Sequence, residues 1–192
     1  MSLGGHSGLT LRTGLTLRTA VFADIPEIES LIARSARGLS TDDYRPSQIE
    51  GALRGAFGVD TQLLTDGTYY AVEQGGRLVG CGGWSFRSTL FGGDARTDRD
   101  ASMLDPRTQP AKVRAFFVDP GNARRGIGTL LLEHCERQAC AHGFAHVELM
   151  ATLPGVKLYA ARGYVGTDTV HYDLGNGETI EFVPMRKALA AP

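Results

Sequence analysis

The sequence predicts an α+β fold in which helices flank a mixed, mostly antiparallel sheet with one β-α-β unit at its centre. Apolar runs joined by short glycine-containing turns, at residues 69–86 and 170–185, indicate antiparallel hairpins. An apolar strand, a glycine-rich turn and a helical pattern, at residues 112–151, indicate a crossover to the next strand. Because hairpins and a crossover occur in one chain, an α+β arrangement fits better than a doubly wound fold.

The first long helix has start and stop signals in the sequence. Asp24 is the expected N-cap, Pro26 lies in the first turn, and Glu27 is the expected capping-box partner. Apolar residues then recur at helical spacing until Gly38, where the helix is expected to end. The sequence also predicts strands at residues 15–20, 69–73 and 78–86, a short helix at 46–53 and a long loop at 89–110.

The central unit begins with a strand at residues 112–118. This strand has apolar residues on both faces, so it is expected in the middle of the sheet. A helix follows over about residues 126–142, and Gly143 is its expected stop. The remaining predicted elements are a strand at 145–151, a short helix at 154–162 and a hairpin formed by 170–174 and 179–185.

The length of 192 residues predicts a single domain, expected over residues 15–188 with a tail at 189–192. Residues 8–13 are repeated directly as residues 14–19. A repeat this short cannot form a solenoid, so residues 1–14 are interpreted as a cloning scar or a disordered N-terminal extension.

Composition argues against several classes of function. A formal net charge of −1 gives no reason to expect nucleic acid or an anionic membrane as the partner. The three cysteines form no CxxC pair, which favours reduced thiols in a cytoplasmic protein. No group of His, Cys and carboxylate residues has metal-ligand spacing, so no metal is expected.

A glycine-rich turn at residues 124–129, Arg-Arg-Gly-Ile-Gly-Thr, opens the central helix. A helix N-terminus presents unpaired N–H groups and partial positive charge, which suits an anion. Gly126 and Gly128 let the backbone approach a phosphate, and the two arginines add charge. The turn lacks the lysine of a P-loop and the third glycine of a dinucleotide fingerprint. On this segment alone, phosphate binding and simple close packing are equally open.

The segment Phe-Phe-Val-Asp-Pro at residues 116–120, followed by residues 124–132, resembles the central motif of the GNAT superfamily of N-acetyltransferases. The resemblance continues in residues 17–25, 70–83 and 158–164, and it therefore covers about residues 15–187. One position departs from the pattern, because Ala123 stands where the family usually has Arg or Gln. The resemblance implies a GNAT-like fold whose central β-α-β unit binds acyl-CoA, with acetyl-CoA as the acyl donor.

The resemblance also implies where the cofactor lies. Pantetheine is expected to pair with the backbone of the central strand, and the pyrophosphate is expected on the amides of residues 124–129. The predicted cofactor-binding residues are Phe117, Val118, Arg124, Arg125, Gly126, Ile127, Gly128 and Thr129.

For catalysis, the resemblance implies direct attack of an amine on the thioester within a ternary complex. The backbone N–H of Val118 is the expected donor to the thioester carbonyl. Tyr159 matches the tyrosine of the family and is the expected general acid for the leaving thiolate; plain core packing is the alternative. Glu148 is the first candidate for a general base, and the alternative is a solvated or salt-bridged carboxylate.

The acceptor is expected to be a primary amine of a small molecule. Trp84, Phe86 and Arg87 lead into the long loop and are the expected substrate-binding residues. The family likeness also suggests a homodimer. Three alternatives stay open: a catalytically silent acyl-CoA-binding sensor or interaction module of the same fold, a nucleotide-binding protein using the same turn, and transfer of a longer acyl group such as succinyl.

Overall fold

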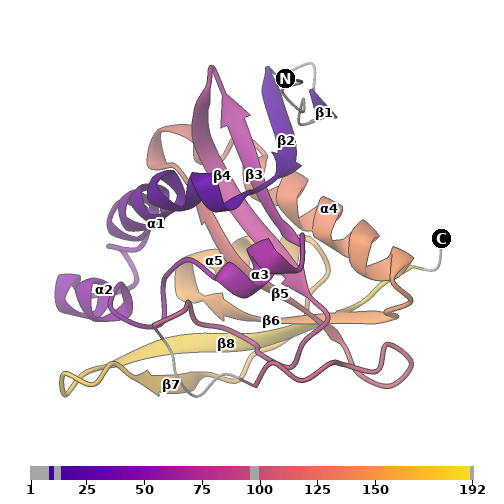
Figure 1. The fold of residues 1–192 in the computed structure, drawn as a ribbon. Coiled ribbons are helices and arrows are strands. Elements are labelled where there is room, and N and C mark those ends of the chain that lie inside the picture. Colours follow the sequence, from indigo (N-terminus) through magenta and orange to yellow (C-terminus); the bar gives the residue numbers. More distant parts are fainter. Residues whose placement is uncertain (1–8, 11–13, 96–99, 191–192) are drawn as a thin grey trace.

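The computed structural model describes residues 9–10, 14–95 and 100–190. Its centre is one eight-stranded sheet with the order β1-β2-β3-β4-β5-β6-β8-β7 (Figure 1). The strands are β1 (Leu9–Thr10), β2 (Leu15–Thr19), β3 (Tyr69–Gln74), β4 (Arg77–Ser85), β5 (Ala111–Val118), β6 (His146–Thr152), β7 (Val170–Asp173) and β8 (Thr179–Ala188). The helices are α1 (Ile25–Leu39), α2 (Pro46–Ala52), α3 (Thr61–Thr65), α4 (Ile127–Ala141) and α5 (Leu153–Ala161), with short 3-10 turns at Phe22–Asp24 and Pro120–Asn122.

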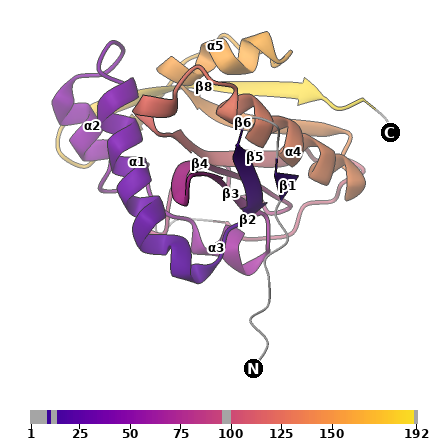
Figure 2. The ribbon, with the colours of Figure 1, turned by 90° about the horizontal axis from the view of Figure 1, so that it is seen from above.

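Helices cover both faces of the sheet (Figure 2). On one face, α4 and α5 pack in a cluster that includes Val113, Leu131 and Tyr159. On the other face, α1, α2 and α3 pack in a second cluster that includes Leu31 and Leu63. The middle strands are therefore buried on both sides, which explains why the strand predicted at residues 112–118 has apolar residues on both faces. None of the described helices is long and apolar enough to cross a membrane.

The pairing of β5 with β6 is the exception in the sheet. All other neighbouring strands are antiparallel, whereas β5 and β6 run parallel and are joined by α4. Their pairing covers only Ala111 with Val147 and Lys112 with Glu148, and the two strands then separate. The predicted α+β fold with a central β-α-β unit is confirmed, because both connection types occur in one sheet.

The predicted strands and helices all occur, with small shifts at their ends. Helix α3 was not predicted, because five residues are too few to show a helical period. Its start signal is nevertheless present in the sequence, since the side chain of Asp60 accepts a hydrogen bond from the backbone of Gln62. At the N-terminus, Leu9 and Thr10 pair with β2 and Gly14 directly precedes it, while the other residues of the expected extension at 1–14 lie outside the described part.

Asp24 is the N-cap residue of α1 and Pro26 lies in the first turn, as predicted, but the expected capping box does not form. A 3-10 turn precedes the helix, and no side-chain hydrogen bond from Asp24 caps it. Asp24 instead accepts hydrogen bonds from Arg18, at 2.7 and 2.9 Å, and from the backbone of Val21. Glu27 accepts a hydrogen bond from the backbone N–H of Leu78 at 2.8 Å. Both carboxylates therefore fasten α1 to the sheet.

Gly38 does not end α1, as the sequence predicted, but lies within it. A Cβ atom at this position would overlap the Cγ atom of Pro120, which belongs to the 3-10 turn after β5. The glycine is therefore present for close packing. It lets α1 lie directly against the segment that leads into α4.

We predict that Gly38→Ala destabilises the protein. Alanine favours a helix interior over glycine by about 1 kcal/mol. The overlap with the rigid proline ring costs about 1–3 kcal/mol, as overpacked sites do, so the net change is a loss of stability. Urea unfolding measures this change, with Gly55→Ala as the control because a Cβ atom there meets nothing within 4 Å. A rise in the stability of the Gly38→Ala protein would contradict the packing argument.

Candidate functional site

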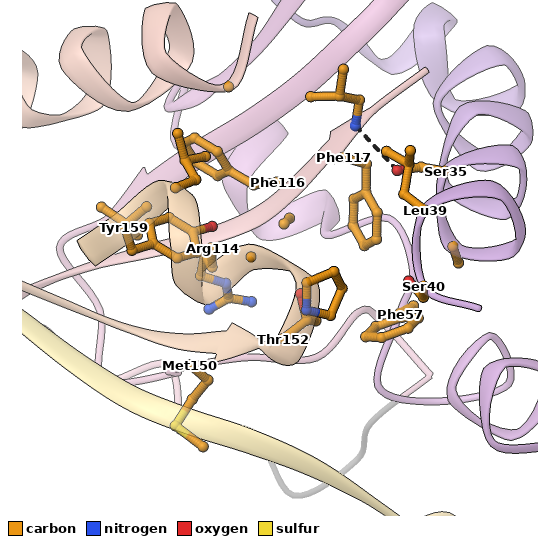
Figure 3. Close-up of a pocket in the computed structure, with 18 of the residues that line it drawn as sticks. Ser35, Leu39, Ser40, Phe57, Arg114, Phe116, Phe117, Met150, Thr152 and Tyr159 are labelled. Atoms are coloured by element: carbon orange, nitrogen blue, oxygen red, sulfur yellow. Dashed lines mark hydrogen bonds between the residues drawn. The ribbon is translucent and has the colours of Figure 1, made fainter. Parts of the chain in front are cut away.

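A cavity of about 710 Å³ lies where β5 and β6 separate (Figure 3). Its lining comes from α1, β5, the start of α4, the end of β6 and α5, together with residues 56–58 and 90–92 and Phe182 of β8. Phe116 and Phe117 project from β5, Tyr159 lies on α5, and Thr152 ends β6 (Figure 3). The cavity therefore occupies the position of the sheet hydrogen bonds that β5 and β6 do not make.

A β-bulge helps to turn β5 away from β6. Cys81 pairs with Phe117 and Gly83 pairs with Arg114, so β5 carries one more residue than β4 across this step. Ala115 occupies the extra position with a left-handed φ of 58°. The Tyr69 hydroxyl lies 3.4 Å from the Cys81 sulfur and 3.5 Å from the Ala115 carbonyl oxygen. Buried side chains of β3 and β4 thus pack against the bulge.

The turn after β5 presents backbone N–H groups to the cavity. The Asp119 carboxylate accepts a hydrogen bond from the Gly121 backbone, and Arg124 and Gly126 both have left-handed φ angles, 62° and 84°. The first α-helical hydrogen bond of α4 runs from Leu130 to Gly126. By helix geometry, the preceding N–H groups of the first turn have no acceptor within the helix. Such N–H groups at the positive end of a helix suit an anion.

The backbone N–H of Val118, in β5, has a side-chain hydrogen-bond partner. It donates a hydrogen bond to the Ser35 hydroxyl of α1 at 3.2 Å (Figure 3). Ser35 is buried and lines the cavity. The donor that was expected to polarise a carbonyl is therefore engaged by a neighbouring side chain. Ser35 itself was not predicted, although a serine on the buried apolar face of α1 is a signal that could have identified it.

Tyr159 places its ring inside the cavity wall. Its side chain is buried, and its ring packs edge-on against Phe116 and Tyr164 with centroids 6.5 and 5.7 Å apart. Burial raises the pKa of the Tyr159 phenol well above its ordinary value. The hydroxyl therefore keeps its proton at neutral pH and can serve as a hydrogen-bond donor.

Comparison with known proteins assigns this architecture to a family. The family model described as "Acetyltransferase (GNAT) family" matches residues 29–164, which is more than half of the chain. The chain belongs to the GNAT acetyltransferase family. A search of curated proteins gives no significant match.

Solved GNAT structures share the fold at low identity. A GCN5-related N-acetyltransferase from Rhodopseudomonas palustris matches with a TM-score of 0.68 at 20% identity, covering 90% of this chain and 94% of the other. The PaiA N-acetyltransferase of Thermoplasma acidophilum, solved with coenzyme A, has a TM-score of 0.61 at 14% identity, with coverages of 91% and 98%. A phosphinothricin acetyltransferase from Sinorhizobium meliloti, solved with acetyl-CoA, has a TM-score of 0.59 at 19% identity, with coverages of 92% and 89%.

Nearly all the predicted cofactor residues of this GNAT chain meet at the cavity. The lining includes Phe117, Val118, Arg124, Gly126, Ile127, Gly128 and Thr129, whereas Arg125 is exposed and lies outside the lining. Lys157 of α5 and Arg162, which directly follows α5, also line the cavity and were not predicted. The Arg162 guanidinium donates to the Thr129 hydroxyl at 3.2 Å. The cavity at the start of α4 therefore combines helix N–H groups with cationic side chains.

Glu148 does not reach the cavity. It forms an ion pair with Lys112 at the end where β5 and β6 are still paired. Met150 and Thr152 follow on the same face of β6, and both line the cavity. Alternation along β6 therefore puts Glu148 on the same face as Met150 and Thr152, but at the last paired position and outside the cavity lining.

The predicted substrate residues do not reach the cavity either. Trp84 is fully buried on the α4 face of the sheet, where it packs against Phe86, His142 and Phe144. Arg87 forms an ion pair with Asp66, with Nε 2.7 Å from the carboxylate. The pattern placed these residues correctly at the end of β4. It could not show that this end lies away from the gap between β5 and β6.

We predict that the buried thiol under the bulge makes the protein sensitive to alkali. Burial raises the pKa of Cys81 from an ordinary value of 9.0 to about 12. Above pH 9 the unfolded chain releases this proton while the folded chain retains it, so stability falls as pH rises. One such group contributes about 1.4 kcal/mol per pH unit between its two pKa values.

The measurement is the free energy of unfolding from urea titrations between pH 8 and 11. Buried tyrosines add to the decline at its upper end, because burial also raises the pKa of Tyr69. In the Cys81→Ala protein, the free energy of unfolding should therefore fall less steeply with pH, by about 1.4 kcal/mol per pH unit, but it should still fall. An identical slope in the variant and the unmodified protein would refute this assignment.

Proposed function

We propose that this chain is an N-acetyltransferase that transfers an acetyl group directly from acetyl-CoA to a primary amine of a small molecule. The observation that carries the proposal is the continuity of the cavity. It joins the anion site at the start of α4 to the open edge of β5 and then to an apolar end. One occupant with phosphates, a chain of amides and a reactive thioester would match these surroundings in order.

The phosphate end supports coenzyme A as the ligand. Arg124 belongs to the turn that leads into the first N–H groups of α4, and Arg162 bonds Thr129 in the first turn of that helix, while Lys157 lines the same cavity. Helix N–H groups and cationic side chains together are a strong anion site, so the family's missing residue at Ala123 is compensated by its neighbours. We infer that these groups hold the pyrophosphate and that the backbone of Phe117 and Val118 pairs with pantetheine.

The bound thioester supplies an activated acetyl group. The residues of this chain orient the thioester and donate hydrogen bonds to it. The Val118 N–H can donate to the ligand if it exchanges its bond with Ser35, or shares it. The Tyr159 hydroxyl donates a hydrogen bond toward the sulfur when the carbon–sulfur bond breaks. The amine loses one proton and the thiolate gains one, so the reaction needs no further reactant.

The single experiment that tests this function is a calorimetric titration with acetyl-CoA, with ATP and NAD as control ligands. We predict that Gly126→Asp weakens acetyl-CoA binding by roughly tenfold or more, because it places a carboxylate beside the pyrophosphate. Gly163→Asp is the matched control. Both glycines have left-handed φ angles, 84° and 83°, and a Cβ atom at either position meets nothing within 4 Å.

The two aspartate variants should lose similar stability, because each replaces a left-handed glycine. Only Gly126→Asp should lose affinity for acetyl-CoA. Equal affinities for acetyl-CoA in both variants would contradict the proposed position of the pyrophosphate at the start of α4. Failure of the unmodified protein to bind acetyl-CoA at all would overturn the proposed function.

We predict that Tyr159→Phe lowers kcat by roughly a hundredfold while changing the affinity for acetyl-CoA by less than about threefold. The substitution removes only the hydroxyl and keeps the buried ring. Tyr164→Phe is the control, because that ring contacts Tyr159 but does not line the cavity. Release of free thiol measures the rate. A protein that binds acetyl-CoA but shows no turnover with any amine would instead be the catalytically silent module.

A further inference from the structure

The end of the cavity away from the phosphate site is built largely from aromatic rings. Four phenylalanines line it: Phe57, Phe91, Phe117 and Phe182. Their rings form one continuous series, with centroid distances of 5.8 Å from Phe117 to Phe57, 6.4 Å from Phe57 to Phe182 and 5.3 Å from Phe182 to Phe91. We call these four residues the phenylalanine wall. Leu39, Leu90 and Met150 add aliphatic surface around it.

The wall contains residues from segments far apart in the sequence. Phe57 follows α2, Phe91 lies in the long loop after β4, Phe117 belongs to β5, and Phe182 belongs to β8. Phe57 and Phe117 point into the cavity from different segments (Figure 3). Phe117 is also the strand residue beside the gap where transfer is proposed. A molecule that packs on the wall therefore has its near end beside that gap.

A buried guanidinium fixes the loop that supplies Phe91. Arg114, whose side chain is 3% exposed, donates to the carbonyl oxygens of Thr89 at 2.8 Å and Gly92 at 3.2 Å. These carbonyls lie on either side of Leu90 and Phe91 in the chain. The same guanidinium forms an ion pair with Asp60, which is fully buried. The loop is therefore held in place, and the wall is a preformed surface.

We propose that the acceptor is a primary alkylamine that bears an aromatic ring, which packs against the phenylalanine wall and directs its nitrogen toward the gap at Phe117. This inference rests on the proposed function and identifies the substrate class of the same site. Aromatic rings gain edge-to-face contacts with the wall beyond the burial of apolar area alone. A polyamine would instead leave a second ammonium group against phenyl and aliphatic side chains, where losing hydration is unfavourable.

The test compares three amines on the protein saturated with coenzyme A. Phenethylamine has the aromatic ring, butylamine has only an aliphatic chain, and putrescine has a second charge. We expect phenethylamine to bind roughly tenfold or more tightly than the other two in calorimetric titrations. In thiol-release assays with acetyl-CoA, kcat/KM should follow the same order.

Substitutions in the phenylalanine wall test whether packing against its rings causes the preference for phenethylamine. Phe91→Leu keeps an apolar side chain and should reduce the advantage of phenethylamine by roughly fivefold or more, and Phe91→Ala should reduce it further. Neither should change the affinity for acetyl-CoA. Phe86→Ala is the matched control, because Phe86 is also a half-buried ring in edge contact with another aromatic residue but lies outside the cavity lining.

Equal or better binding of butylamine or putrescine, or no binding of phenethylamine, would overturn the aromatic-amine assignment. So would an equal loss in Phe86→Ala and Phe91→Leu. If acetyl-CoA binds in these cases, the proposed function stands and only the substrate class is wrong. If the unmodified protein does not bind acetyl-CoA, both conclusions fail.

Discussion

The early separation of β5 from β6 is the constraint on which the rest of the structure depends. A sheet is stable when its interior strands pair along their length, because buried N–H and C=O groups need partners. Here the pairing stops after Lys112 and Glu148, and the backbone edge of β5 opens onto a cavity. Part of this loss of backbone hydrogen bonds is offset within the chain, because the Ser35 hydroxyl accepts a hydrogen bond from the backbone N–H of Val118. A bound ligand with amide groups would offset more of it.

Helix α1 holds this open arrangement together from one face. Glu27 bonds the backbone of β4, Arg34 forms an ion pair with Asp119 at 3.1 Å, and Gly38 lets the helix rest on Pro120. Two of these three contacts are with the segment between β5 and α4. The helix therefore controls the geometry of the turn that presents the N–H groups, although it contributes none of them.

Much of the fold was predictable because its signals are local. The hairpins, the central strand and α4 follow from turn residues and periodicity, and the turn at residues 124–129 combines glycines with charge in a short segment. Asp24 and Glu27 were correctly seen as important, but their partners, Arg18 and the backbone of Leu78, lie on β2 and β4. A capping pattern cannot distinguish a cap from a tertiary contact when the carboxylate has a stronger partner within reach.

The site residues form the same two groups: some have a local sequence signal, and others are brought together only by tertiary packing. Residues near the phosphate end lie in consecutive positions, so one motif identifies most of them. The phenylalanine wall joins four separate segments, and only the packing of the chain brings them together. Trp84, Phe86 and Glu148 were selected for residue type and for closeness in sequence to the expected site. The structure places all three outside the lining, because the direction in which a strand end points depends on the whole sheet.

The two ends of the cavity depend on different parts of the chain and can therefore vary independently. The phosphate end depends on backbone geometry that α1 and α4 hold, so substitutions there affect any acceptor equally. The wall depends on side chains from a loop tied down by Arg114 and Asp60. Removing one member of such a buried ion pair typically costs about 3–5 kcal/mol, because the other charge is left without a partner. Changes within the loop that keep this pair, such as those at Leu90 and Phe91, alter the surface presented to the acceptor without this penalty. The acceptor preference can therefore change while the donor site remains the same, which fits a family whose members share a fold at low sequence identity.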